Sequence, residues 1–205
     1  GIVAGISMED QPEIKNNAIL EINFDGVLKD YVSFEQDAFN AVLKVNQEIG
    51  FNQILGIIKK AKNDSKIKAI SINDIPNGIG WAQLTELRNA LESFKETGKK
   101  VWAYGDFYTQ KKYYLATVAD TLVMSPTGSV DLKGMHAETL FFKDFQDKFG
   151  FQMEVIRHGK YKSAVEPFIA NKMSTDNRQQ ISELIHSIWQ QVKLDIEASR
   201  NLDLE

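Results

Sequence analysis

The residue best suited to chemistry in this chain is Lys162, in the run Tyr161–Phe168 (YKSAVEPF) that follows an apolar, strand-like stretch. An ordinary lysine has a pKa near ~10.4, so it accepts a proton at neutral pH only if its surroundings lower that pKa by roughly 3 units, about 4 kcal/mol. Apolar neighbours and the charge of Arg157 and Lys160 would lower the pKa of Lys162, whereas Glu166 would raise it if its carboxylate reached the amine. The residues alone leave two interpretations open, a general base and a solvated surface lysine.

A serine that could react with such a base is not evident in the sequence. Ser163 adjoins Lys162, but neighbouring side chains on a helix or strand diverge, so we expect Ser163 to support or pack. Ser65 and Lys68 have the S-x-x-K spacing that some serine enzymes place on a helix. Here that spacing straddles a predicted turn and the start of a strand, which indicates a chance match. The chain contains no G-x-S-x-G run.

Two groups of motifs carry a resemblance to a known family. The run Arg157–Phe168, followed by Met173 and Ser174, closely resembles the hallmark of the amino-terminal domain of the signal peptide peptidase A family, the bacterial protease IV in its long two-domain form. A second match at the same spacing lies upstream, at Tyr113–Ala116, Ala119–Asp120, Ser125–Val130 and Gly134. The likeness runs from about Ala18 to the end of the chain and is weakest before Gly50.

The resemblance implies a serine endopeptidase with a Ser/Lys dyad that needs no cofactor and hydrolyses cleaved signal peptides and other hydrophobic peptides. In such a family Lys162 would be the catalytic general base, and the nucleophilic serine would lie in a second, carboxy-terminal domain that this chain lacks. This chain would therefore be inactive alone. The implied partners are that second domain, a peptide substrate and further copies of the chain in a homo-oligomer, a tetramer by resemblance.

Two alternatives belong to other functional classes. The first is a non-catalytic oligomerisation and substrate-feeding module of the same fold, which predicts a charged, water-exposed Lys162. The second is an acyl-CoA enzyme, which requires a working pair of amides at Gly78 and Gly80. Glycine amides at the start of a helix can bind an oxyanion, but Ile79 interrupts this pair, which favours a flexible strand-to-helix turn.

The position at which the family's second domain carries its serine is occupied here by Thr109-Gln110-Lys111-Lys112. This helix start is degenerate, and no hydroxyl in it has an obvious partner in the sequence. The interpretation of a missing nucleophile therefore agrees with the residues present.

The composition bounds the remaining possibilities. The chain has 205 residues, 43% of them hydrophobic, and a net charge of -4, which permits a sizeable core and argues against a nucleic-acid partner bound through phosphates. It contains no cysteine, which excludes disulfides and thiol catalysis. Its three histidines, His136, His158 and His186, lack metal-ligand spacing, so we expect no metal site.

The first residues are predicted to differ from the rest. Gly1–Ser7 is a short apolar run, too short for the ~20 residues that cross a bilayer. We interpret residues 1–17 as a loose segment, the end of a removed membrane anchor, with a processed soluble start as the alternative. Residues 18–205 are then the peptidase domain. The resemblance implies a bacterial inner membrane location with the catalytic domains on the outer, periplasmic side.

Apolar strand-like runs alternate with helical patterns along the chain, which predicts an α/β domain with a mostly parallel sheet and flanking helices. The resemblance narrows this to the spiral of ββα units in the Clp protease and crotonase superfamily. Gly128 and Gly134 are predicted turn residues, and the phenylalanines from Phe141 to Phe149 a core or a subunit interface. The predicted strands cover 18–24, 67–72, 101–104, 121–124 and 152–156, and the predicted helices 51–61, 81–97, 110–118, 138–149 and 176–199.

Overall fold

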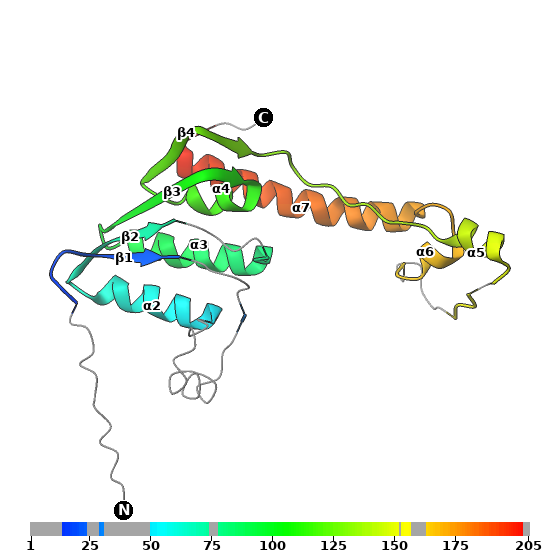
Figure 1. The fold of residues 1–205 in the computed structure, drawn as a ribbon, viewed down its shortest axis with the longest axis horizontal. Coiled ribbons are helices and arrows are strands. Elements are labelled where there is room, and N and C mark those ends of the chain that lie inside the picture. Colours follow the sequence, from blue (N-terminus) through cyan, green and yellow to red (C-terminus); the bar gives the residue numbers. More distant parts are fainter. Residues whose placement is uncertain are drawn as a thin grey trace, which may run out of the picture. The chain divides into compact units, whose positions relative to one another are not determined.

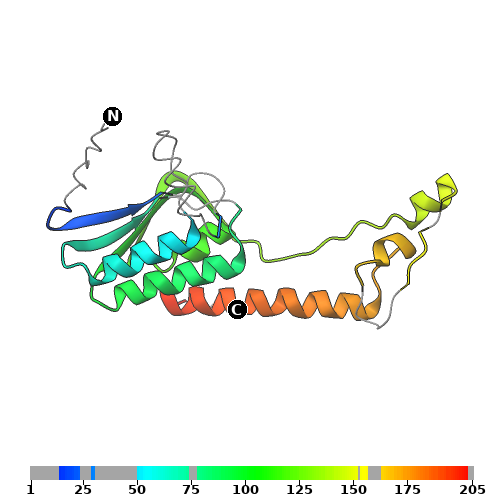
Figure 2. The same cartoon turned by 90° about the horizontal axis from the view of Figure 1, so that it is seen from below.

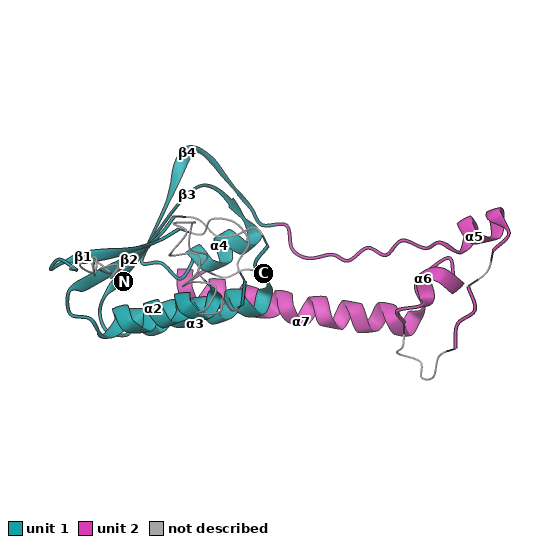
Figure 3. Cartoon of the chain, turned by 60° about the horizontal axis from the view of Figure 1, so that its bottom comes forward, with its two compact units in different colours: residues 1–132 teal, residues 133–205 magenta. Residues whose placement is uncertain are grey.

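The computed structural model describes residues 14–23, 29–30, 50–73, 78–151, 153–156 and 163–202. The chain divides into two compact units, residues 1–132 and residues 133–205 (Figure 3).

The first unit is built on a parallel sheet of four strands in the order β1-β2-β3-β4 (Figure 1). The strands are β1 (Ala18–Ile22), β2 (Ile67–Ile72), β3 (Lys100–Thr109) and β4 (Thr121–Asp131). Each connection moves the chain one strand further in the same direction, which is the progression that a spiral of strand and helix units requires. The predicted α/β class with a parallel sheet is confirmed.

In the part of the chain that the structure describes, the helices that connect these strands are α2 (Phe51–Asn63), α3 (Trp81–Lys95) and α4 (Gln110–Ala116). Helices α2 and α3 lie side by side on one face of the sheet (Figure 2). Their inward residues recur at helical spacing, with Leu84, Leu87, Leu91 and Phe94 of α3 almost fully buried. Gly98, the predicted end of this helix, has a φ of +81°, which a residue with a side chain rarely adopts.

A buried arginine joins α3 to α4. The Arg88 side chain is 1% exposed, and its Nη1 donates to the carbonyl oxygen of Tyr114 at 2.6 Å and to Thr117 Oγ1 at 3.0 Å. Its guanidinium also lies 4.9 Å from the centroid of the Tyr114 ring. These contacts pair a carbonyl and a hydroxyl oxygen at the end of α4, and they give the buried guanidinium the acceptors it needs.

Helices α2 and α3 begin in the same way. Gly50 and Gly80 occupy the N-cap positions with extended backbones, and the side-chain oxygens of Gln53 and Gln83 accept their amide protons at 2.9 and 3.0 Å. Successive strand-helix units thus share one capping device, G-[FW]-x-Q, which is an internal repeat that the sequence analysis did not recognise.

The pairing of β3 and β4 contains an irregularity. Gly105 pairs with Met124 and Phe107 with Ser129, so four residues of β4 stand opposite one residue of β3. A Cβ atom on Gly128 would lie 2.2 Å from the carbonyl oxygen of Asp106. The prediction of a turn at Gly128 is therefore wrong: the glycine lies within β4 and permits a close approach of two backbones. Both strands also extend beyond their predicted ends.

The second unit contains α5 (Lys143–Phe149), α6 (Glu166–Ile169) and α7 (Thr175–Arg200). The predicted helix over 138–149 begins only at Lys143, because the amide of Phe142 donates to the carbonyl oxygen of Pro167 at 2.7 Å. The predicted strand over 152–156 is absent from the described part of that range, 153–156, where the Met153 amide pairs with a side chain. The long helix predicted over 176–199 is confirmed by α7.

Candidate active-site segment

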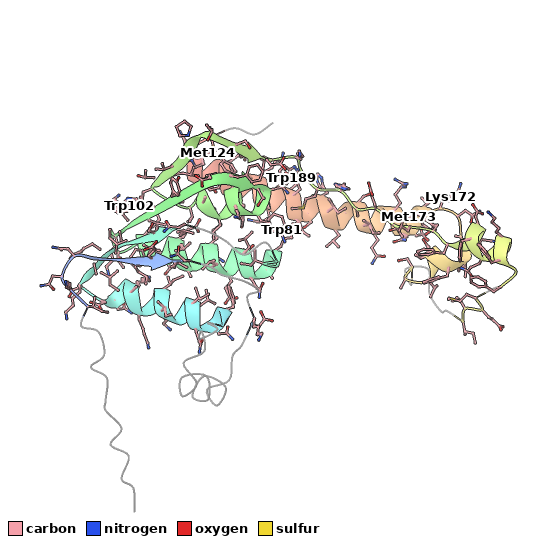
Figure 4. All side chains as sticks on the ribbon, in the orientation of Figure 1. Trp81, Trp102, Met124, Lys172, Met173 and Trp189 are labelled. Carbon is pink, nitrogen blue, oxygen red and sulfur yellow. The ribbon has the colours of Figure 1, made fainter. Side chains whose placement is uncertain are left out.

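The predicted base, Lys162, lies outside the described residues, as do residues 157–161. The chain on both sides of this segment is described, up to Ile156 and again from Ser163. Figure 4 labels Lys172 and Met173, which lie between α6 and α7 on the downstream side. The described geometry is that of the two flanks, residues up to 156 and from 163.

The downstream flank is a hydrogen-bonded turn leading into α6. The amide of Glu166 donates to the carbonyl oxygen of Ser163 at 2.9 Å, and the amide of Ala170 to the carbonyl oxygen of Glu166 at 3.0 Å. Pro167 occupies the first turn of α6, where its missing amide breaks no helical hydrogen bond. The backbone directly after Lys162 is thus fixed to α6.

The carboxylate of Glu166 ties α6 to the start of α7. Glu166 is 3% exposed, and its carboxylate oxygens accept hydrogen bonds from Ser174 Oγ at 2.5 Å, the Ser174 amide at 3.1 Å and Asn177 Nδ2 at 2.9 Å. Ser174 is also the N-cap of α7, and its Oγ accepts the amide proton of Asn177 at 3.2 Å. A buried carboxylate requires such donors, and here they come from the first turn of a 26-residue helix.

The upstream flank is held by Gln146 of α5. Gln146 is 4% exposed; its Nε2 donates to the carbonyl oxygen of Phe168 at 3.0 Å, and its Oε1 accepts the Met153 amide at 3.2 Å. The Phe142 and Phe168 rings stack beside this contact, with centroids 5.8 Å apart. The Gln146 side chain therefore joins Met153, which precedes the lysine segment, to α6, which follows it.

Aromatic side chains of α5 gather on a surface rather than in a core. The Phe145 ring lies 4.6 Å from that of Phe149 and 5.9 Å from that of Phe151 between centroids. Phe145 is 54% exposed, Phe149 63% and Phe151 49%, and Ile156 is 99% exposed. The interpretation of Phe145 and Phe149 as core residues is therefore wrong, and their role at an interface stays a prediction. We call Phe145, Phe149 and Phe151 the α5 aromatic cluster.

A separate cleft of about 270 Å³ lies in the first unit, lined by the ends of β2 and β3 and by Lys112 and Ala116 of α4. The carboxyl ends of parallel strands are common positions for ligands in α/β folds. Tyr104 donates to Asp106 at 2.7 Å, and this hydrogen bond, with the negative charge of Asp106, raises the pKa of Tyr104. Tyr108 is buried, which raises its pKa to about 12, and its hydroxyl donates to the carbonyl oxygen of Val123 at 3.0 Å.

The other positions considered in the sequence, at Gly80, Thr109 and Ser65, have structural roles. The Gly80 amide donates to Gln83, which favours the strand-to-helix turn over an oxyanion site. Thr109 is the N-cap of α4, and its Oγ1 accepts the Lys112 amide proton at 3.5 Å, so the hydroxyl for which no partner was evident does have one. Ser65 lies in a turn and Lys68 in β2, which confirms that their spacing is not helical.

Sequence reasoning missed Gln146 and Asn177. Asn177 follows the N-cap Ser174 by three residues, a spacing at which polar side chains commonly take part in helix capping, so a signal was present. Gln146 stands in a short helix among charged residues, and no local pattern distinguishes it from a solvated glutamine. Among the described residues, no group of three or more His, Cys, Asp or Glu side chains is arranged to hold a metal ion. Within the same residues, every helix is too short or too polar to span a bilayer.

Comparison with known proteins places this segment in a family. The profile of peptidase family S49 matches residues 93–205, which include β3, α4 and the segment with Lys162. The chain belongs to peptidase family S49. The resemblance to the signal peptide peptidase A family is thereby confirmed.

Several relatives have similar sequences. Protease 4 of Haemophilus influenzae is 33% identical over 195 residues, which are 92% of this chain and 32% of that protein. Protease 4 of Salmonella typhi is 38% identical over 158 residues, 76% of this chain and 25% of that protein. The chloroplastic serine protease SPPA of Arabidopsis thaliana is 26% identical over 176 residues, 86% of this chain and 25% of that protein. The chain thus spans a quarter to a third of the length of these relatives.

One solved structure, described as an enoyl-CoA hydratase/isomerase from Acinetobacter baumannii, matches with a TM-score of 0.31 and 11% identity. The match covers 74% of this chain and 75% of that one.

Proposed function

We propose that this chain supplies the general base of a serine peptidase that uses a Ser/Lys dyad, and that Lys162 is that base. The observation that carries the proposal is the match of family S49 across the segment with Lys162, at residues 93–205. Ser65 and Lys68 do not share a helix, and Lys62, whose Nζ donates to Ser93 Oγ at 2.7 Å, lies outside the residues that the family matches. The nucleophilic serine is therefore assigned to a further domain of a longer protein, which the greater length of the relatives permits.

The proposed reaction is hydrolysis of a peptide bond through an acyl-enzyme. The neutral amine of Lys162 takes the proton of the serine hydroxyl as the oxygen attacks the peptide carbonyl, and then delivers it to the leaving amine. Water, deprotonated in turn by the same amine, releases the acyl group. The proposed substrates are cleaved signal peptides and other hydrophobic peptides.

The proposed assembly contains this domain, the carboxy-terminal catalytic domain and further copies in a homo-oligomer, a tetramer by resemblance. The exposed α5 aromatic cluster supports an apolar contact of this kind, because rings of this size are costly to leave in water. We further propose a membrane anchor upstream of residue 18 and a place on the outer side of a bacterial inner membrane.

The proposal predicts that Lys162→Ala, made in the longer protein with both domains, lowers kcat for a hydrophobic peptide by about 10²-fold to 10⁴-fold. Lys172→Ala is the matched control: it removes the same charge from an exposed lysine ten residues downstream and should leave kcat unchanged. The measurement is steady-state hydrolysis of a fluorogenic peptide.

Normal turnover by Lys162→Ala would instead favour the alternative function, a non-catalytic module that assembles the oligomer and feeds substrate. The isolated 205-residue chain provides a second check, since it should neither hydrolyse the peptide nor react with a serine-directed phosphonate probe.

A further inference from the structure

The buried polar side chains of the second unit are concentrated in one place. Among its described residues, the buried polar side chains are Gln146, Glu166 and Asn177. All three take part in the contacts of α6, and two of those contacts reach the residues that bracket 157–162. Burying a polar side chain is unfavourable unless it forms hydrogen bonds. Because all three side chains form theirs around α6, we look for one structural role that they share.

The contacts bracket the lysine segment from both ends. Upstream, Gln146 Oε1 accepts the amide proton of Met153; downstream, the backbone of Ser163 is joined to Glu166. Gln146 Nε2 then binds the carbonyl oxygen of Phe168, within the same four-residue helix as Glu166. Met153, four residues before the segment, and Ser163, directly after it, are therefore both linked to α6.

Helix α6 is itself too short to hold a fixed position by its own hydrogen bonds. Glu166 fixes the position of α6, because its carboxylate accepts hydrogen bonds from three donors at the start of α7. Removing these acceptors would leave donors of Ser174 and Asn177 without their partner, and α6 would be free to shift against α7. The two flanks of the lysine segment would shift with it.

We propose that Glu166 and Gln146 are positioning residues for the lysine base. Glu166 holds the backbone at Ser163, and Gln146 holds the backbone at Met153. Glu166 also attaches α6, which both residues contact, to the start of α7. This inference rests on the proposed function of Lys162. A displacement of about 1 Å between a base and its nucleophile lowers catalysis by about 10²-fold, so a defect in such an anchor lowers kcat much more than it raises KM.

The first test is Glu166→Gln in the longer protein. The substitution keeps the size of the side chain but replaces one of the two accepting oxygens by an NH₂ group, so at least one of the three donors loses its acceptor and the charge is removed. We expect kcat to fall by about 10-fold to 100-fold, with KM within twofold of the unsubstituted protein. Gln179→Ala is the control, because Gln179 lies exposed on the same helix α7, where its Nε2 donates to Glu183 at 2.8 Å.

A coupling measurement separates positioning from a general loss of structure. Glu166→Gln is introduced into the Lys162→Ala protein, and residual hydrolysis of an activated ester is measured. If Glu166 acts through Lys162, the second substitution should change the residual rate by less than twofold. An equal loss in both backgrounds, or an unchanged kcat for Glu166→Gln alone, would overturn the proposal.

Gln146→Met tests the upstream anchor in case Glu166→Gln does not fold. It removes both hydrogen bonds of Gln146 while keeping its volume, and we expect the same fall in kcat with the same lack of effect in the Lys162→Ala background. A wild-type kcat for Gln146→Met would count against the inference. Normal activity of Lys162→Ala would instead defeat the proposed function itself, so the two failures are distinguishable.

Discussion

Tyr108 shows at the scale of a single residue how the first unit changes the chemistry of a side chain. Its ring is 3% exposed and folds back against β3, where a Cβ on Gly105 would lie 2.9 Å from its Cζ. Burial disfavours the charged phenolate and raises the pKa to about 12, while the hydroxyl keeps a hydrogen bond to Val123. A residue beside the cleft is thus held neutral and fixed in place.

The raised pKa of Tyr108 predicts a loss of stability in alkali. An unfolded tyrosine ionises near pH ~10, whereas the folded one keeps its proton to about pH 12, so stability is complete below pH ~10 and declines as the pH rises toward 12. Between pH 10 and 11 the free energy of unfolding should fall by about 1 kcal/mol more in the unsubstituted chain than in Tyr108→Phe. Urea unfolding at both pH values measures this, and parallel declines would contradict it.

The strands and helices are the scale at which sequence reasoning performed best. The periodic apolar residues of α3 and the runs of β1 and β2 were sufficient, because buried faces repeat at the spacing of the element. The structure could not be predicted where an amide found a long-range partner. The Phe142 amide donates to the carbonyl oxygen of Pro167, and the Met153 amide donates to Gln146. No local sequence pattern indicates either contact.

The close approach of β3 and β4 predicts opposite effects for one substitution at two glycines. Gly128→Ala would place a methyl group 2.2 Å from a backbone oxygen that cannot move freely, so the chain should lose about 1–3 kcal/mol of stability. Gly56→Ala, inside α2, has nothing within 4 Å of the new atom and should gain about 0.5–1 kcal/mol from helix propensity. Thermal unfolding of both variants checks the pair; equal effects would contradict the proposed packing at Gly128.

For the whole molecule, the sequence identified a family and predicted one catalytic residue, Lys162, and the structure adds the contacts made by the residues before and after the segment that contains it. The resemblance depended on motifs at Tyr113–Ala116 and Arg157–Phe168. Their residues and their order can be read from the sequence without knowing the fold. The frame could not be predicted, because Gln146 and Glu166 look like ordinary surface residues until α5, α6 and α7 are assembled. The proposal that the nucleophilic serine lies in a further domain belongs to the same scale, and the chain spans a quarter to a third of the length of its relatives.

The most direct measurement of the central claim is the titration of the Lys162 amine in the longer protein. Lysine side chains labelled with ¹⁵N are followed by NMR as the pH is raised, and the signal of Lys162 is assigned by its loss in Lys162→Arg. The account predicts that this amine loses its proton well below the ~10.4 of an ordinary lysine, close to neutral pH. An amine that stays protonated together with the exposed lysines would contradict it.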